Sequence, residues 1–505
     1  MESEYYEMYL KEVAKNEKLE AEMEKLEDKI EKLEEAAAKN KELEAKVKKF
    51  EESIVLLNAQ VSKLKSILNT DSNNSGIPTS LTSIGQPKRI PNTREKSDKK
   101  IGGQVGHKKS KLDAFEDEEI TERQHHQTIT CSNCGSGETK ETGDSQTRDE
   151  YEIKVTVKKI RHHFNETKCS ECDHIETPEI PIQLHAENQY GVNIQAILIS
   201  LLNQGFVSMS RTKEMMFGMT GGIVNVSVGY VAKLQKRLAL ALALFMIQLR
   251  LAVIASDLVQ WDDTVIFIAK KRACLRVYVA GDFAYYAAHQ QKNKKGIDKD
   301  GILLALNEKK IVMHDHNKVN YNDDYCFLNA ECCRHLNSDL QKMHDNIKHS
   351  WALELKKLLS GTNVLRNEGQ SYDVEQVRAK YDELINLGFS QNEKEYDRVW
   401  HRDAEVKLLK RLIKYKDNYL MWLENPIVPF TNNESERSLR MSKTKMKVSG
   451  QFQNVKNAEY FATIRSYIET GRRHGFNPIY IIIRALKGDF VSLEEMIEYK
   501  NQCAS

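Results

Sequence analysis

Proline, glycine and long apolar runs are scarce in this sequence. The chain has 8 prolines in 505 residues, and neither proline nor glycine occurs in residues 8–68. Its longest apolar run, Leu238 to Ile247, has ten residues, which is too short to span a bilayer and is typical of a buried helix. Residues 1–13 are acidic and contain no apolar signal-peptide core. We therefore expect a soluble protein that stays in the cytoplasm.

An excess of charge of one sign is also missing. Lys and Arg number 75 and Asp and Glu 73, which gives a net charge of +2. The charges are segregated, however, because residues 71–112 carry nine bases against three acids and residues 431–488 carry eleven against four. The 9 cysteines are odd in number and four stand in Cys-x-x-Cys pairs, which favours a reducing compartment and metal binding over disulfides. A chain of this length predicts three or four structural units.

Residues 1–69 predict a coiled-coil helix. Apolar residues recur in steps of four and three, first over 19–37 and again over 43–68. The spacing from Leu33 to Leu43 is ten residues, so the heptad register slips once near Asn40. A solitary charged helix is the alternative, but the repeat favours a homo-oligomer, with a dimer as the expected state. The repeat positions are Leu19, Met23, Leu26, Ile30, Leu33, Ala37, Leu43, Val47, Phe50, Ile54, Leu57, Val61, Leu64 and Leu68.

Residues 70–118 have the composition of a basic, flexible linker. Ser, Asn, Pro and Gly dominate this stretch and no periodicity is left. Its positive charge suits a salt-sensitive contact with nucleic-acid phosphates. Lys99, Lys100 and Lys108 are the candidate DNA contacts, and a linker that is merely solvated is the alternative.

Residues 119–185 predict a zinc ribbon. Cys131 and Cys134 form one Cys-x-x-Cys pair, and Cys169 and Cys172 form a second one, with 34 residues between the two pairs. Two such pairs are the usual way to offer four thiolates to Zn²⁺ in a tetrahedron. The alternating residues 151–161 between them predict a strand. Because four thiolates leave no ligand position open, we expect a structural zinc ion.

Residues 186–250 look helical, with breaks at Gly205 and at Gly221-Gly222. Ser227 to Leu244 could be the second helix of a helix-turn-helix that binds DNA, and a plain helical bundle is the alternative. Residues 251–326 then change to strands, with a helix around 301–306 and a further strand over 310–315, which is an α/β pattern. Residues 327–428 are expected to be a helical insertion, and residues 429–505 to complete the α/β domain and end in helices.

Three acids lie far apart in the sequence and could form one site. Asp262 lies in the first predicted strand of the α/β domain, Asp315 ends the fourth, and Glu436 precedes a run of bases near the C-terminus. Hydrolysis and transfer at phosphodiesters commonly use two Mg²⁺ ions held by carboxylates. The alternatives are acids that cap turns and, for Glu434 and Glu436, ion pairs on a helix face.

The order of motifs resembles that of the large transposases of insertion-sequence-66 elements. The coiled coil and the linker are followed by Gly-Gly-Gln-Val-Gly-His at 102–107 and by the cysteine quartet. Asp262-Asp263-Thr264 stands where the family has Asp-Glu-Thr. Residues 432–437 match the family's Asn-Asn-x-x-Glu-Arg block, and residues 445–450 continue it. A Cys-x-x-His-x-x-Arg segment of the family has a counterpart that contains His335, with Ser338 in place of the Arg.

The resemblance implies a ribonuclease-H-like catalytic domain of the DDE type, so the expected fold class is multidomain α+β. It implies cleavage and strand transfer at the element's own DNA ends, with Asp262, Asp315 and Glu436 holding Mg²⁺ or Mn²⁺. Asp263 and Glu434 are the fallback acids, and His335 either orients phosphate or a metal-bound water or simply packs. A non-catalytic DNA-binding regulator or a degenerate copy is the alternative function. A bacterial, nucleoid-associated location and small accessory proteins are further expectations, and the expected DNA contacts are Arg437, Arg440, Lys443, Lys445 and Lys447.

Overall fold

The computed structural model describes residues 2–68, 114–181, 184, 186–393 and 399–504. These residues form helices and one mixed sheet of five strands in the order β5-β4-β3-β6-β7, which confirms an α+β fold. Lys99, Lys100 and Lys108 of the predicted linker lie outside the described residues. Contacts divide the chain into two units, which are described separately. The first comprises Met1–Pro91, Asp257–Trp261 and Leu306–Glu434, and the second comprises Asn92–Ser256, Asp262–Ala305 and Ser435–Ser505.

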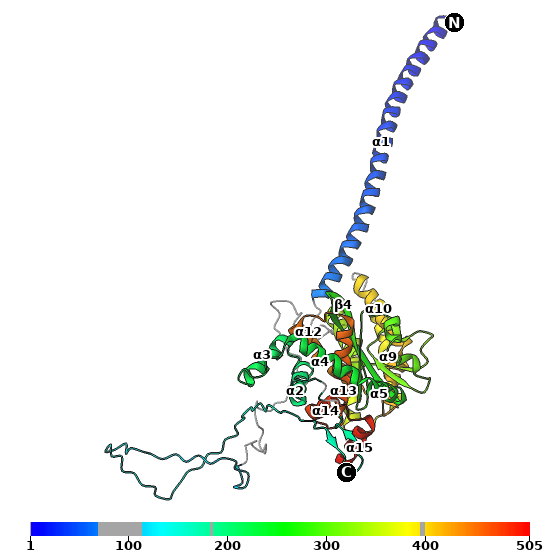
Figure 1. The fold of residues 1–505 in the computed structure, drawn as a ribbon. Coiled ribbons are helices and arrows are strands. Elements are labelled where there is room, and N and C mark those ends of the chain that lie inside the picture. Colours follow the sequence, from blue (N-terminus) through cyan, green and yellow to red (C-terminus); the bar gives the residue numbers. More distant parts are fainter. Residues whose placement is uncertain (1, 69–113, 182–183, 185, 394–398, 505) are drawn as a thin grey trace. The chain divides into compact units, whose positions relative to one another are not determined.

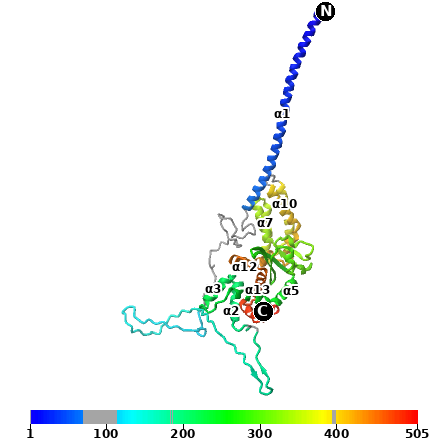
Figure 2. The ribbon, with the colours of Figure 1, turned by 45° about the horizontal axis from the view of Figure 1, so that its top comes forward.

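Helix α1 (Glu2–Leu68) is one uninterrupted helix in the first unit. It is the long blue helix of Figure 1, and the turned view of Figure 2 shows the same course. The lack of Gly and Pro removes the residues that most often break a helix. Apolar side chains at the heptad positions are exposed, for example Leu33 at 69% and Phe50 at 68%. The predicted helix is confirmed, and its pairing in a coiled coil stays a prediction.

Three parallel strand segments form the sheet of the first unit. The start of β3 (Leu258–Ile268) pairs with β6 (Ile311–His314), and β6 pairs with β7 (Leu328–Glu331). Ile311 lies opposite Leu328 and His314 opposite Glu331. The carboxyl ends of β6 and β7 therefore lie at the same edge of the sheet. Strand β7 was not expected, because its four residues fall inside the predicted helical insertion.

The rest of the predicted insertion is helical. Its helices are α7 (Cys333–Ile347), α8 (Ser350–Asn367), α9 (Val374–Glu393), α10 (Val399–Lys414) and α11 (Lys416–Leu420). Their buried faces share one apolar core with β6 and β7, in which Trp351, Tyr381 and Trp422 are at most 1% exposed. Glu405 is fully buried in this core, where Trp351 Nε1 donates to it over 2.6 Å and Asn392 Nδ2 over 2.8 Å.

The second unit contains a helical bundle. Helices α2 (Val192–Asn203), α3 (Met209–Met219), α4 (Val228–Ala241) and α5 (Ala243–Ala255) share an apolar core with α13 (Val455–Arg473), α14 (Pro478–Leu486) and α15 (Leu493–Ala504). The expected breaks are present, since Gly221 and Gly222 have positive φ values of 57° and 84°. Eight residues separate α3 from α4, more than the three or four of a helix-turn-helix. The structure therefore favours a plain bundle.

Strands β4 (Lys271–Ala280) and β5 (Phe283–His289) form an antiparallel hairpin in the second unit. Helix α13 is fixed against β5 because its side chains accept hydrogen bonds from strand amides: Ser466 from Tyr286 N (2.8 Å) and Thr470 from Ala284 N (3.2 Å). The hairpin is followed by the short helix α6 (Lys294–Asp298) and a 3₁₀ turn over Leu303–Ala305. That turn lies where a helix was expected.

The cysteine-rich region has little regular structure. Among the described residues of this region, β1 (Thr167–Lys168) and β2 (Ile175–Glu176) are the only strands that pair, and they flank Cys169 and Cys172. The strand predicted over residues 151–161 is absent. Its apolar side chains are largely exposed, for example Ile153 at 84%. The alternating pattern was present, but no strand of the described residues pairs with this segment.

No single helix in the described part of the chain is both long and apolar enough to cross a bilayer. Helices α4 and α5 meet that test only as a pair, with a bend of 54°. The apolar run from Leu238 to Ile247 covers the junction of these two helices. Leu238, Leu242 and Phe245 are fully buried, whereas Leu240, Leu244 and Ile247 are 49% to 58% exposed. The run therefore buries one side of two helices instead of forming the single buried helix that was expected.

Candidate metal centre

The candidate centre begins at the common edge of β6 and β7. Asp315 directly follows β6, and Cys332 directly follows β7. Helix α7 begins at Cys333, so His335 lies in its first turn. The two strands are parallel and adjacent, so the residues that follow them, Asp315 and Cys332, lie close together although they are far apart in the sequence.

His335 forms an ion pair with Asp315. Its Nδ1 lies 3.0 Å from Asp315 Oδ1, and both side chains are about one-third exposed, at 35% and 33%. Burial alone would lower the pKa of His335, but hydrogen bonds with Asp315 and Cys332 raise that pKa to about 11. Protonation of the imidazole compensates the charge of the carboxylate, and a metal ion that binds the imidazole nitrogen would displace that proton. The contact with Asp315 is compatible with either role expected for His335, so its role stays a prediction.

Asn432 connects the candidate centre to β3. It is fully buried, its backbone N–H donates to Cys332 Sγ (3.2 Å), and its side-chain amide donates to the carbonyl of Trp261 (2.9 Å). Trp261 is the residue before Asp262. The first Asn of the Asn-Asn-x-x-Glu-Arg block therefore has a structural role, because it holds this segment beside the strand that carries Asp262.

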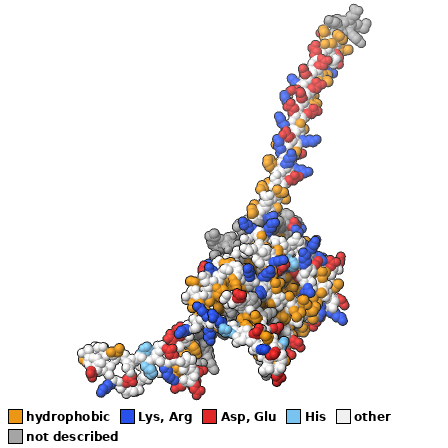
Figure 3. Space-filling view, viewed as in Figure 1, with side chains coloured by type: hydrophobic (Ala, Val, Ile, Leu, Met, Phe, Trp, Pro, Cys, Tyr) orange, Lys and Arg blue, Asp and Glu red, His pale blue; other side chains and the backbone are white. Residues whose placement is uncertain are grey.

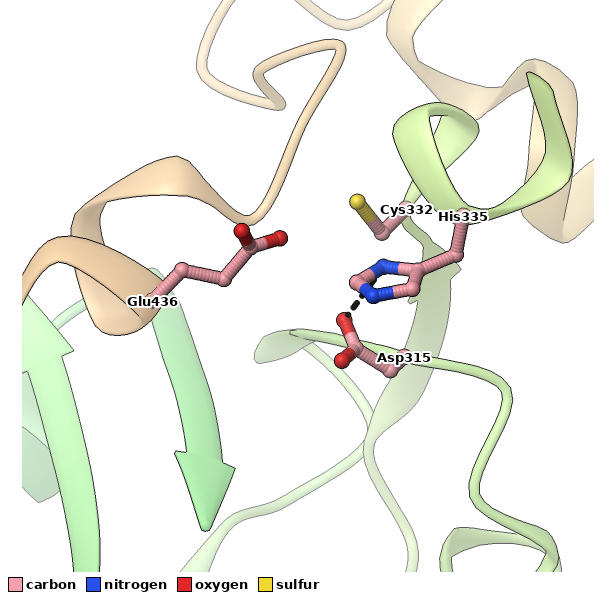
Figure 4. A group of neighbouring side chains, drawn as sticks. All are labelled: Asp315, Cys332, His335 and Glu436. Atoms are coloured by element: carbon pink, nitrogen blue, oxygen red, sulfur yellow. Dashed lines mark ion pairs between the residues drawn. The ribbon is translucent and has the colours of Figure 1, made fainter. Parts of the chain in front are cut away.

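Glu436 completes a group of four possible metal ligands. One ligand atom from each of Asp315, Cys332, His335 and Glu436 lies within 4.8 Å of the others. Figure 4 shows the Glu436 carboxylate directed toward the cysteine sulfur and the imidazole. Glu436 lies in the first turn of α12 (Asn433–Ser449). Residues two apart on a helix are rotated by about 200°, so Glu434 points away from the direction of Glu436.

The donor atoms in this group are of two kinds. The carboxylate oxygens of Asp315 and Glu436 suit Mg²⁺ or Mn²⁺, which prefer hard oxygen ligands. The sulfur of Cys332 and the nitrogen of His335 are softer donors that suit Zn²⁺ better than Mg²⁺. The residues present therefore fit a divalent ion, and the two carboxylates are the part of the group that fits Mg²⁺.

The backbone on both sides of Asp315 is fixed to β7. His314 Nε2 and Asn329 Oδ1 are 2.8 Å apart, and His316 Nδ1 lies 2.8 Å from Glu331 Oε1. Glu331 is 1% exposed, and it also accepts a hydrogen bond from Tyr321. A buried carboxylate is costly unless hydrogen bonds compensate its charge. This network therefore orients the turn that presents Asp315.

Asp262 and Asp263 have different surroundings on β3. Neighbouring residues of a strand point to opposite faces. Asp263 Oδ1 is 2.5 Å from Lys292 Nζ, and its side chain is 6% exposed. Asp262 accepts a hydrogen bond from the Asp263 amide over 2.7 Å. Asp262 is not among the four grouped residues, so its metal-ligand role stays a prediction, and Asp263 already has a cationic partner.

The basic residues of α12 divide into an exposed set and one buried lysine. Arg437, Arg440, Lys443 and Lys447 are exposed. Lys445 is only 7% exposed, and its Nζ lies 5.7 Å from the centre of the Phe461 ring. Burial lowers the pKa of Lys445 to about 8. The predicted DNA contact at Lys445 does not fit this position, since its ammonium group faces the interior.

The two Cys-x-x-Cys pairs form matching turns. The amide of Cys131 donates to Ser136 O and that of Cys169 to His174 O, each over 2.8 Å. Backbone amides of the residues within each pair lower the pKa of Cys131 and of Cys169, which favours thiolates. In the described ranges the four cysteines are not gathered into one group of ligands. The zinc site therefore stays a prediction.

Sequence reasoning did not name Cys332, Asn432 or Glu331 as site residues. Cys332 could have been found from its spacing to His335 in the Cys-x-x-His segment. Asn432 was present in a quoted motif, but its role requires the fold, because Trp261 is 171 residues away. Glu331 carries no motif, and only the pairing of β6 with β7 brings it close to Asp315.

A comparison with protein-family models now adds to this geometry. The model described as Transposase IS66 family matches residues 187–460, which is more than half of the chain. The chain belongs to the IS66 transposase family. The match includes Asp262, Asp315, His335 and Glu436 and ends within α13. No curated protein matches the chain. Membership of the family implies a transposase role, contact with DNA and the use of a divalent metal ion.

Proposed function

We propose that this protein cleaves phosphodiester bonds at the ends of its own insertion sequence and joins those ends to target DNA. The observation that carries the proposal is the group formed by Asp315, Cys332, His335 and Glu436, in a chain of a transposase family. Asp315 follows β6 and Glu436 lies in α12, so these two acids can form one site only through the fold. The strand order β5-β4-β3-β6-β7 supports a ribonuclease-H-like catalytic domain with a helical insertion before Glu436.

Asp262, Asp315 and Glu436 would hold the metal ions. Two bound Mg²⁺ or Mn²⁺ ions supply activation of the attacking oxygen and stabilisation of the leaving oxygen. His335 keeps the Asp315 carboxylate oriented through the 3.0 Å ion pair, and Asn432 holds the segment before Glu436 against Trp261. These contacts fix the ligands before substrate binds, which reduces the entropy lost on reaching the reactive geometry.

The exposed bases of α12 would bind the DNA backbone. Arg437, Arg440, Lys443 and Lys447 lie on the exposed side of one helix, and cations in such a row suit phosphates without reading sequence. Lys445 is left out of this set because it is buried. The proposal also includes the linker lysines as further DNA contacts. A structural Zn²⁺ at the four cysteines would support the DNA-binding region.

The test is a cleavage and strand-transfer assay on DNA that carries the gene's own flanking ends. Wild type would be compared with Asp315→Ala and Glu436→Gln in Mg²⁺, in Mn²⁺ and with EDTA. We expect metal-dependent products from wild type and none from either variant. Asp339→Ala is a control, since that carboxylate pairs with Arg411 over 2.6 Å and is not in the group of four. Binding to the ends without products from wild type would favour a DNA-binding regulator.

A further inference from the structure

The apolar seam of α1 is not covered, along most of its length, by any other of the residues that the structure describes. From Leu19 to Leu64 the apolar heptad residues are 46% to 69% exposed. Figure 3 shows hydrophobic side chains among acidic and basic ones along the described part of the helix. A continuous apolar stripe of this kind on a soluble helix is stable only when another helix covers it. The question is which helix, in which orientation and in which register.

The residue types at the two seam positions favour a two-stranded parallel pair. With Leu19 at position d, the apolar a positions are Met23, Ile30 and Ala37, and after the register slip they are Val47, Ile54, Val61 and Leu68, so four of the seven are β-branched. β-Branched residues at a combined with Leu at d favour parallel dimers. Leucine occupies d at positions 19, 26, 33, 43, 57 and 64.

Polar residues in the seam favour the same arrangement. Asn16 takes an a position in the first block, and Asn40 takes one in the second block. A buried Asn at a selects a dimer in which it meets its own copy, at a cost in stability. The three extra residues between Leu33 and Leu43 add a second constraint. If one chain were shifted by a heptad, this irregular stretch would lie opposite regular heptads of the other chain.

The charges beside the seam decide the orientation. Five of the six charged e positions are acids, with Lys65 as the exception, and four of the five charged g positions are Lys. An antiparallel pair brings e against e and g against g, so it would juxtapose like charges. A parallel pair brings each g against the e position five residues further along its partner. The parallel pairs are Lys15 with Glu20, Lys29 with Glu34, Lys39 with Glu44 and Lys46 with Glu51, against one like-charged pair, Glu22 with Glu27.

We propose that α1 pairs with α1 of a second copy of this chain as a parallel, in-register, two-stranded coiled coil. Both chains then leave the coiled coil at the same end, after Leu68. The pairing itself does not rest on the proposed function. The role of the pairing in transposition does rest on the proposed function. Two catalytic regions tethered at one point have a raised effective concentration relative to each other, so they can act together on the two ends of one DNA element.

The orientation is tested by energy transfer between labels at the N-termini of the full-length protein. Donor-labelled and acceptor-labelled chains are mixed and allowed to exchange. A helix of 67 residues is about 100 Å long, so antiparallel chains would carry their labels too far apart for transfer. Efficient transfer, together with the mass of a dimer in sedimentation equilibrium, is the expected result. A dimer without transfer, a trimer or a monomer at all concentrations would overturn the proposal.

Charge reversals test the register without touching the apolar seam. One variant carries Lys29→Glu with Lys46→Glu, and the other carries Glu34→Lys with Glu51→Lys. In a parallel pair each variant alone meets like charges, so we expect its dimer dissociation constant to rise roughly tenfold or more, whereas an equimolar mixture should form heterodimers. Unchanged homodimers of both variants would indicate an antiparallel pair and overturn the proposal.

A matched control separates pairing from general charge effects. Lys25 and Lys49 occupy c positions on the outer face, so Lys25→Glu with Lys49→Glu changes the net charge by the same amount. We expect this control to dimerise like wild type. Because DNA cleavage is not the readout, an inactive but dimeric protein would contradict the proposed function and leave the pairing intact.

Discussion

Replacing Lys445 by Met should stabilise the protein near neutral pH. Lys445 is 7% exposed, and its nearest polar partner is the carbonyl of Leu202 at 3.5 Å. Burial lowers the pKa of Lys445 from 10.5 to about 8. At pH 7 the ammonium group is therefore charged in an interior that penalises charge.

The size of the effect follows from the shift in pKa. One pKa unit corresponds to about 1.4 kcal/mol, so a change from 10.5 to about 8 corresponds to roughly 3 kcal/mol. The contact between the Lys445 ammonium and the Phe461 ring, at 5.7 Å, offsets part of this penalty. We therefore expect Lys445→Met to raise the free energy of unfolding by about 1–3 kcal/mol at pH 7.

The pH dependence gives the sharper test. Between about pH 8 and 10.5 the unfolded chain still binds the Lys445 proton and the folded chain does not, so wild-type stability should rise relative to the variant. Urea denaturation at several pH values measures this difference. Lys443→Met, at an exposed position of the same helix, should follow wild type. Parallel curves for wild type and Lys445→Met from pH 7 to 10.5 would refute the reasoning.

Three further variants test the contacts around the candidate centre. Asn432→Ala leaves the buried Trp261 carbonyl without its donor and should cost about 1–3 kcal/mol, seen as a lower urea midpoint; an unchanged midpoint would contradict the contact. Glu331→Gln replaces the buried carboxylate that contacts His316 and Tyr321 by a neutral amide, which weakens both contacts. It should reduce metal-dependent cleavage by destabilising the turn at Asp315, with full activity as the contrary result. Arg440→Ala combined with Lys447→Ala should weaken binding to specific and unrelated duplexes alike and lower the salt slope by about 2, measured by anisotropy titrations at several salt concentrations.

Much of the fold could be predicted from the sequence because strong local signals set it. The absence of Gly and Pro gives α1, and the β-rich runs around residues 258–289 give β3 to β5. Strand β7 could not be predicted, because its four residues, Leu328–Glu331, are too few for a pattern and are defined by pairing with β6. The strand expected over residues 151–161 had the pattern but has no pairing partner in the described part of the chain.

The candidate centre was only partly predictable for the same reason. Asp315 and Glu436 were found from motifs, and the structure groups them with His335. Cys332 and Glu331 contribute through the neighbouring strand, so a non-local contact was required to find them. Lys445 was predicted as a DNA contact together with its basic neighbours, but the structure buries it. The run of charges does not show which of its members the helical period turns toward the interior.

The most direct test of the central claim is the metal preference of Asp315→Cys in the end-cleavage assay. A sulfur ligand binds Mg²⁺ poorly and tolerates the softer Mn²⁺ better. If Asp315 holds a metal ion that the reaction requires, the variant should give almost no product in Mg²⁺ and regain product in Mn²⁺, with wild type active in both. Equal cleavage by the variant in Mg²⁺ and Mn²⁺, at the wild-type rate, would contradict a role for Asp315 as a metal ligand.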